Sequence, residues 1–152
     1  MSESQLRLAD HPFFKDLNPQ EVEKFTHCAH SISLGAGDYL FREGGDADRL
    51  FLVQEGKVAL ELDVPGKHPI TILTVEGGGV VGWSWLFPPH RWYLAAKATV
   101  PTRLVALDAK SLMNEFEKNP SVGLELMKRV ANIIFQRLQA VGMQFLSVAG
   151  KV

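Results

Sequence analysis

The sequence contains a single cysteine, Cys28, among its 152 residues. One cysteine cannot form an internal disulfide, and the neighbouring Phe25 and Ala29 favour a buried, unreactive thiol. The sequence also lacks an apolar signal region and any run of about 18 apolar residues, so we expect a cytoplasmic protein that makes no membrane contact. The formal net charge of −1 supplies no overall positive field, and we therefore expect no binding to nucleic acid.

The residue patterns of common enzyme sites are missing too. No His-x-His pair is followed by a glutamate in a strand pattern, and Ser84 has neither a glycine-framed elbow nor a nearby base. The histidines are spread along the chain at His11, His27, His30, His68 and His90. His27 and His30 are one helical turn apart, which is typical of an exposed helix face when no strand carboxylates accompany them. We predict no catalytic residue, no metal site and no enzymatic activity.

The spacing of apolar residues changes twice along the sequence, which we interpret as one domain covering residues 1–152. Helical patterns cover about residues 11–31, a period of two runs over 32–107, and helical patterns return over 108–147. Short apolar runs are separated by glycine-rich turns at Gly35–Asp38, Glu43–Asp46, Glu55–Lys57, Val64–Lys67 and Glu76–Gly79. Short strands spaced in this way are typical of a β jelly roll, also called a double-stranded β-helix. The predicted fold is therefore mainly β with flanking helices, the last of them long.

The long helix is predicted from Pro120 to about Leu146. Asn18, Asp108 and Asn119 stand where residues that cap helices are expected. The long helix carries two apolar stripes, of which one comprises Leu126, Val130 and Ile133. The other has the spacing of a coiled-coil seam and comprises Met127, Ala131, Ile134, Leu138, Val141 and Phe145. We expect one stripe to pack on the β domain and the other to form a homodimer, the alternative being that both are buried within one chain.

All three tryptophans fall within ten residues, between Trp83 and Trp92. Tryptophan is large and carries an N–H group that needs a partner, so this concentration beside Gly82, two prolines and Arg91 indicates a shaped surface or pocket. The alternative is that the rings fill a corner of the core under a turn.

Two motifs resemble a known family. The stretches are His11–Phe14 with Leu17 and Glu21, and Gly37-Asp38-Tyr39-Leu40-Phe41-Arg42-Glu43-Gly44-Gly45-Asp46 followed by Leu50–Val58. They resemble the cyclic nucleotide-binding domain of the catabolite activator and fumarate-nitrate regulator transcription factors, over about residues 11–147. The resemblance implies an eight-stranded jelly roll with a short phosphate-binding helix, an N-terminal helical piece and a C-terminal dimer helix.

The same resemblance places a phosphate-binding cassette at the tryptophans. In the family, the cassette is a glycine, an acidic residue that holds the ribose, a short helix, and an arginine followed by a small residue. Gly82 matches the glycine, but Trp83 stands at the acidic position, and Trp92 and Tyr93 stand where the arginine and the small residue belong. Arg91 comes one place early, and a strand side chain displaced by one residue points to the opposite face.

The candidate ligand site follows from these positions. It comprises Gly82, Trp83, Ser84, Trp85, Leu86, Arg91, Trp92 and Tyr93, with Arg137 of the long helix placed over the base. The ligand would be a cyclic nucleotide or another small anionic or aromatic molecule. We predict a stand-alone regulatory sensor, without a helix-turn-helix domain, that signals through contacts with an effector protein of unknown identity. The alternative is a ligand-free scaffold or interaction module whose tryptophans fill the pocket.

Overall fold

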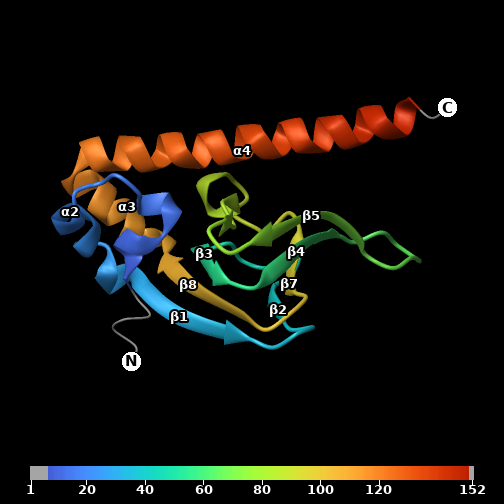
Figure 1. Ribbon diagram of the computed structural model, residues 1–152, viewed down its shortest axis with the longest axis horizontal. Coiled ribbons are helices and arrows are strands. Elements are labelled where there is room, and N and C mark those ends of the chain that lie inside the picture. The colour runs from blue at the N-terminus through green and yellow to red at the C-terminus, as the bar shows by residue number, and fades with distance from the viewer. Residues whose placement is uncertain (1–6, 151–152) are drawn as a thin grey trace.

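Two four-stranded antiparallel sheets form the body of the molecule (Figure 1). The structure is a computed structural model and describes residues 7–150. One sheet has the order β1 (Ala29–Leu34), β8 (Thr102–Asp108), β3 (Arg49–Glu55) and β6 (Val80–Val81). The other has the order β2 (Tyr39–Phe41), β7 (Ala95–Ala98), β4 (Lys57–Leu62) and β5 (Ile70–Glu76). The predicted jelly roll with flanking helices is confirmed.

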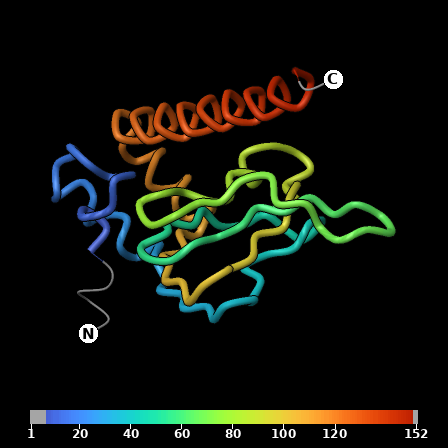
Figure 2. Tube along the Cα trace, turned by 45° about the vertical axis from the view of Figure 1, so that its right-hand side comes forward, coloured from blue at the N-terminus to red at the C-terminus, as the bar shows by residue number. Residues whose placement is uncertain are grey.

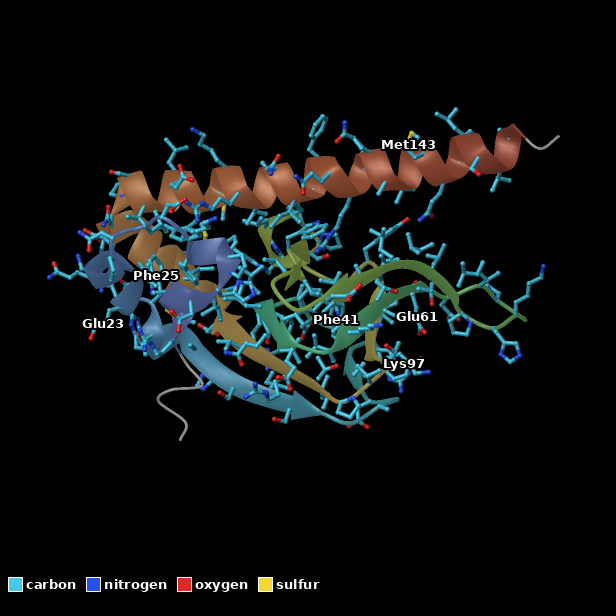
Figure 3. The ribbon with its side chains drawn as sticks, viewed as in Figure 1. Glu23, Phe25, Phe41, Glu61, Lys97 and Met143 are labelled. Atoms are coloured by element: carbon cyan, nitrogen blue, oxygen red, sulfur yellow. The ribbon has the colours of Figure 1, made fainter. Side chains whose placement is uncertain are left out.

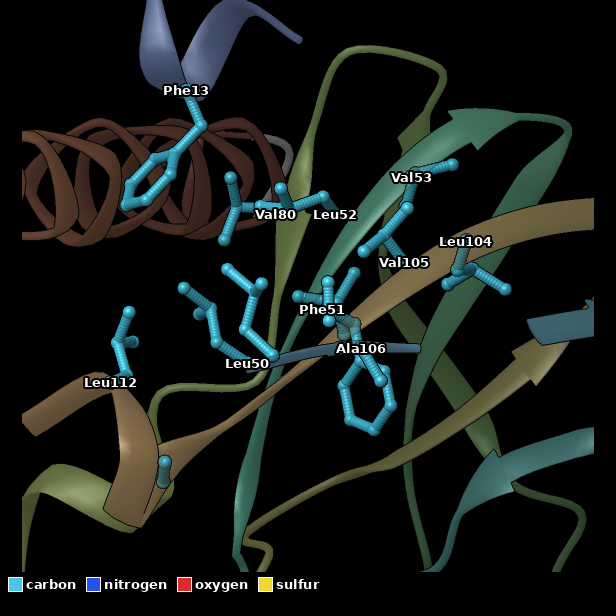
Figure 4. Packing of buried hydrophobic residues seen from close by; sticks show 14 of the residues in the cluster. Phe13, Leu50, Phe51, Leu52, Val53, Val80, Leu104, Val105, Ala106 and Leu112 are labelled. Atoms are coloured by element: carbon cyan, nitrogen blue, oxygen red, sulfur yellow. The ribbon is translucent and has the colours of Figure 1, made fainter. Parts of the chain in front are cut away.

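The core centres on β3, which pairs with β8 on one side and with β6 on the other. Residues 50–53 of this strand form a continuous apolar run, and each is 0% exposed. A continuous run, rather than an alternating one, indicates that both faces of the strand are covered. Figure 4 shows residues of β3 and β8 packed together, with Leu112 of the helix after β8 nearby.

Short helical turns precede the first strand. They are η1 (Leu8–Asp10), η2 (Pro12–Phe14), α2 (Pro19–Glu23) and η3 (Thr26–Cys28). Asn18 caps α2 as expected, because its Oδ1 accepts a hydrogen bond of 2.9 Å from the backbone N–H of Gln20. β1 begins at Ala29, three residues before the predicted change of period at Ile32, because Ala29 already pairs with Leu107 of β8.

Two helices follow β8. α3 (Ala109–Lys118) is capped by Asp108, whose carboxylate accepts a hydrogen bond of 2.9 Å from the Ser111 N–H. Asn119 caps α4 (Pro120–Ala149), because its Oδ1 accepts a hydrogen bond of 3.4 Å from the backbone N–H of Val122. Figures 1 and 2 show α4 lying along one side of the sandwich, from the N-terminal turns to the β4–β5 hairpin. None of the helices in residues 7–150 is long and apolar enough to cross a membrane.

The two stripes of α4 have different surroundings. Leu126 is 0% exposed and Val130 is 2% exposed, and both belong to the hydrophobic core. In the predicted dimer stripe, Met127 and Ile134 are only partly exposed and pack against the core. The others are open to solvent, with Ala131 exposed, Val141 at 38%, Leu138 at 68% and Phe145 at 71%.

Phe135 rather than Ile134 belongs to the outer face of α4, with 56% of its surface exposed. Met127 and Phe145 are 18 residues apart, which is five full turns of a straight helix, so both point in the same direction. They differ in exposure because the apolar residues of α4 that pack against the core end at Ile134, and every residue from Leu138 to Gly150 is exposed. The outer apolar face consists of Leu124, Ala131, Phe135, Leu138 and Phe145, and is called the outer stripe below.

Candidate functional site at the Trp-rich turn

The candidate site begins where β6 ends and the chain turns into a single-turn helix. Gly82 has φ +87°, a conformation that residues with a Cβ rarely adopt, and it leads through Trp83 into η4 (Ser84–Leu86). A Cβ built on Gly82 would lie 3.0 Å from the Trp92 ring and 3.3 Å from the Phe51 ring. Glycine is therefore required both by the turn and by the rings packed against it.

Trp92 lies against this glycine and is 5% exposed. Its ring stacks on that of Phe41 (labelled in Figure 3), with centroids 3.9 Å apart and planes 12° from parallel. Its backbone is held to the β2–β3 turn by two hydrogen bonds. The Trp92 N–H donates to the backbone oxygen of Gly45 at 2.9 Å, and the Gly44 N–H donates to the backbone oxygen of Trp92 at 2.8 Å. Ring and backbone are thus both fixed, and the indole occupies the space beside the cassette glycine.

Arg137 of α4 reaches the same turn. Its Nη2 donates to the backbone oxygen of Val80 in β6, and its guanidinium carbon lies 4.7 Å from the centre of the Trp83 ring. Burial lowers the pKa of Arg137 to about 10, so the group remains a cation at neutral pH. Among the described residues, Nη1 of Arg137 is a buried side-chain atom with no hydrogen-bond partner. Arg137 therefore joins α4 to the cassette through its contacts with Trp83 and Val80.

Three predicted ligand residues lie elsewhere. Arg91 is exposed and forms an ion pair of 3.1 Å with Asp46, while also donating to the Gly44 oxygen at 3.1 Å. It faces the β2–β3 turn, as the one-residue displacement from Trp92 requires. Trp85 is buried and donates from its indole N–H to the Gly82 oxygen at 3.0 Å, and Leu86 packs against the core. Trp85 and Leu86 thus support the turn instead of facing a ligand.

The space left at the cassette is a cavity of about 90 Å³. Small-molecule sites usually measure about 300–1,000 Å³, so this cavity is too small for a nucleotide. It is lined by predicted residues and by three others that the sequence analysis missed, namely Phe41, Leu60 and Leu94. Phe41 in β2 and Leu60 in β4 are distant from the cassette in the sequence, so no local pattern relates them to it, whereas Leu94 directly follows Tyr93 and was simply not included. The predicted lining residues are Gly82, Trp83, Ser84, Trp92, Tyr93 and Arg137.

Comparison with known proteins agrees with this architecture. Residues 31–119 match the family model described as the cyclic nucleotide-binding domain. The transcriptional regulator SdrP of Thermus thermophilus is 32% identical over 120 residues, which are 75% of this chain and 59% of SdrP. The anaerobic regulatory protein of Bacillus subtilis is 33% identical over 92 residues, covering 59% of this chain and 38% of that protein. The chain thus spans about half the length of these relatives.

A solved structure extends the match over nearly the whole chain. It is the crystal structure of a putative cyclic nucleotide-binding protein from Geobacter metallireducens, with a TM-score of 0.74 and 30% sequence identity. The alignment covers 91% of this chain and 98% of that one. Fold, cassette position and relatives together define a sensor-type domain of the kind found in regulators. More specifically, the chain belongs to the cyclic nucleotide-binding domain family.

Proposed function

We propose that this chain is a regulatory domain that signals through protein contacts and whose cassette does not take an ordinary cyclic nucleotide. The observation that carries the proposal is Trp92, buried and stacked on Phe41 directly against Gly82. A nucleotide in the cassette would have to displace this indole.

The carboxylate and the arginine that the family resemblance implies for a cyclic nucleotide are also not available at their expected positions. Trp83 replaces the carboxylate that the family resemblance implies for the ribose, and Arg91 is engaged by Asp46 at 3.1 Å. A hydrogen bond to a charged group is worth about 1.5–3 kcal/mol. Loss of two such contacts would weaken binding by roughly two to four powers of ten.

A second candidate function is binding of a different, flat molecule at the mouth of the cassette. Tyr93 favours it, because its ring lines the small cavity and is nevertheless 74% exposed. Such a ligand would stack on Trp83 or Tyr93 without entering the space of Trp92.

Calorimetric titration with cyclic AMP and cyclic GMP tests the proposal. We expect no saturable heat with either nucleotide up to about 1 mM, for the wild type and for Tyr93→Ala alike. Saturable binding of either nucleotide to the wild type, with a dissociation constant below about 100 μM, would refute it. If the second candidate is correct, a flat aromatic probe such as indole-3-carboxylate binds the wild type, and Tyr93→Ala weakens it.

We further propose that the protein contacts include a second copy of the chain, bound through the outer stripe of α4. Leu124, Phe135, Leu138 and Phe145 are between 56% and 71% exposed and continue one face over three heptads. Contiguous apolar surface of this kind favours association.

Sedimentation at micromolar concentration tests the dimer. Leu138→Glu places a charge in the outer stripe and should give a monomer. Met143→Glu is the matched control, because Met143 is 67% exposed on the same helix but lies outside the stripe, on the side away from the sheets (Figure 3). The dimer is refuted if the wild type sediments as a monomer, or if both variants dissociate equally.

A further inference from the structure

A second cavity lies away from the cassette and is much larger than the one there. It measures about 610 Å³ and lies between the N-terminal turns, the β5–β6 turn and α4. Its walls are Pro12, Phe13, Lys15 and Asp16, the turn Gly78–Val80, and one face of α4 from Glu125 to Arg137. Figure 4 shows Phe13 beside α4, with Val80 below it. The volume falls within the range of about 300–1,000 Å³ that is typical of small-molecule sites.

The charge of this cavity is predominantly positive. Lys15, Lys128, Arg129 and Arg137 line it, against the two carboxylates of Asp16 and Glu125. Glu125 is neutralised within the wall, because it forms an ion pair of 2.8 Å with Arg129. Among residues 7–150, neither Lys15 nor Lys128 has a carboxylate partner within ion-pair distance. The cavity therefore offers two exposed ammonium groups to a negatively charged ligand.

The wall that carries these charges is held in place by further contacts. Nη1 of Arg129 donates a hydrogen bond of 2.8 Å to the backbone oxygen of Phe13, which joins α4 to the N-terminal turns. Asn132 and Gln136 follow on the same face of α4 and add amide groups that can donate or accept. A site built from three fixed segments loses little order when it binds a ligand.

Arg137 is shared between this cavity and the cassette, because it lines both. Its Nη1 is buried without a partner, and leaving a charged donor unpaired costs free energy. An anion in the larger cavity could accept from this nitrogen after a small side-chain rotation. The same rotation would change the contact between Arg137 and Trp83, in which the guanidinium carbon lies 4.7 Å from the centre of the ring.

We propose that this cavity binds a small organic anion with two or more negative groups, of the phosphate or carboxylate type. Lys15 and Lys128 would contact the anionic groups, and Asn132 and Gln136 would bind the polar atoms between them. This site is separate from the cassette, so the proposal holds whether or not the cassette is closed to cyclic nucleotides.

Calorimetry and thermal unfolding with inorganic pyrophosphate and with citrate test the proposal and separate the two chemical types. We expect at least one of these probes to bind saturably below about 1 mM and to raise the melting temperature. The double variant Lys15→Gln/Lys128→Gln should bind at least tenfold more weakly, and both side chains are exposed, so the variant should fold. Lys67→Gln, at an exposed turn remote from the cavity, is the control and should bind within twofold of the wild type.

Three results would overturn the proposal. They are no saturable binding of either probe up to about 10 mM, an equal loss of affinity in Lys67→Gln, or unchanged affinity in the double variant. Intrinsic fluorescence supplies a further readout, because movement of Arg137 should change the emission of Trp83, and Trp83→Phe should remove that change. A positive cyclic AMP titration together with a negative pyrophosphate titration would refute both proposals separately.

Discussion

Replacement of Trp92 by alanine tests whether the indole holds the cassette closed. The side chain is 5% exposed, and the centre of its ring lies 3.9 Å from that of Phe41, on which it stacks, and 6.1 Å from that of Phe51. Truncation of a buried tryptophan to alanine costs about 3–5 kcal/mol, from lost burial and from the cavity left behind. For a domain of this length, that loss lowers the melting temperature by about 6 to 20 °C.

Urea unfolding followed by circular dichroism measures the loss directly. Tyr93→Ala is the neighbouring control, because Tyr93 is 74% exposed and its removal should change the free energy of unfolding by less than about 0.5 kcal/mol. Indole at about 1 mM should restore part of the stability of Trp92→Ala, since enlarged apolar cavities bind aromatic molecules of matching size. A loss below about 1 kcal/mol, or equal losses in the two variants, would refute the closed cassette.

Other parts of the fold give sharp expectations. His11 accepts a hydrogen bond from the Phe13 N–H and bonds to the Val53 oxygen, and burial lowers its pKa. The contribution of His11 to the free energy of unfolding should therefore be present above about pH 6.5 and lost as the pH falls below that value. His11→Gln should flatten the dependence of the free energy of unfolding on pH in this range, as measured by urea unfolding. Gly56→Ala should cost more than about 2 kcal/mol, because φ is +107° and a Cβ would lie 2.4 Å from a side-chain oxygen, whereas Gly66→Ala, with nothing within 4 Å, should cost about 1 kcal/mol. Cys28, buried and with its pKa raised to about 11, should react with iodoacetamide at neutral pH only after unfolding, and rapid modification of the folded protein would contradict its burial.

The sequence predicts best where structure depends on neighbouring residues. Asn18, Asp108 and Asn119 cap the helices expected of them, because a cap needs only the next two or three residues. The opposite directions of Trp92 and Arg91 are local too, because Arg91 forms an isolated β-bridge with Asp46, and successive side chains of an extended segment point to opposite sides.

Predictions were weaker where distant segments meet. Trp92 is recognisable as an unusual cassette residue, but its stacking on Phe41 depends on how β2 sits beside the loop before β7. The larger cavity combines Lys15, Gly79 and Lys128, which are separated by at least 49 residues at each step, so no pattern within one segment could indicate it. The exposed stripe of α4 (Pro120–Ala149) depends on where the core beneath the helix ends, at Ile134, and the sequence of the helix alone does not show that point.

The outer stripe of α4 affects how any stability measurement on this chain depends on concentration. If Leu138 and Phe145 are covered by a second copy, folding and pairing are linked by mass action. Each tenfold rise in chain concentration would then add about 1.4 kcal/mol per mole of dimer to the free energy of unfolding. The abundance of the chain in its cell would thereby set how firmly each copy is folded.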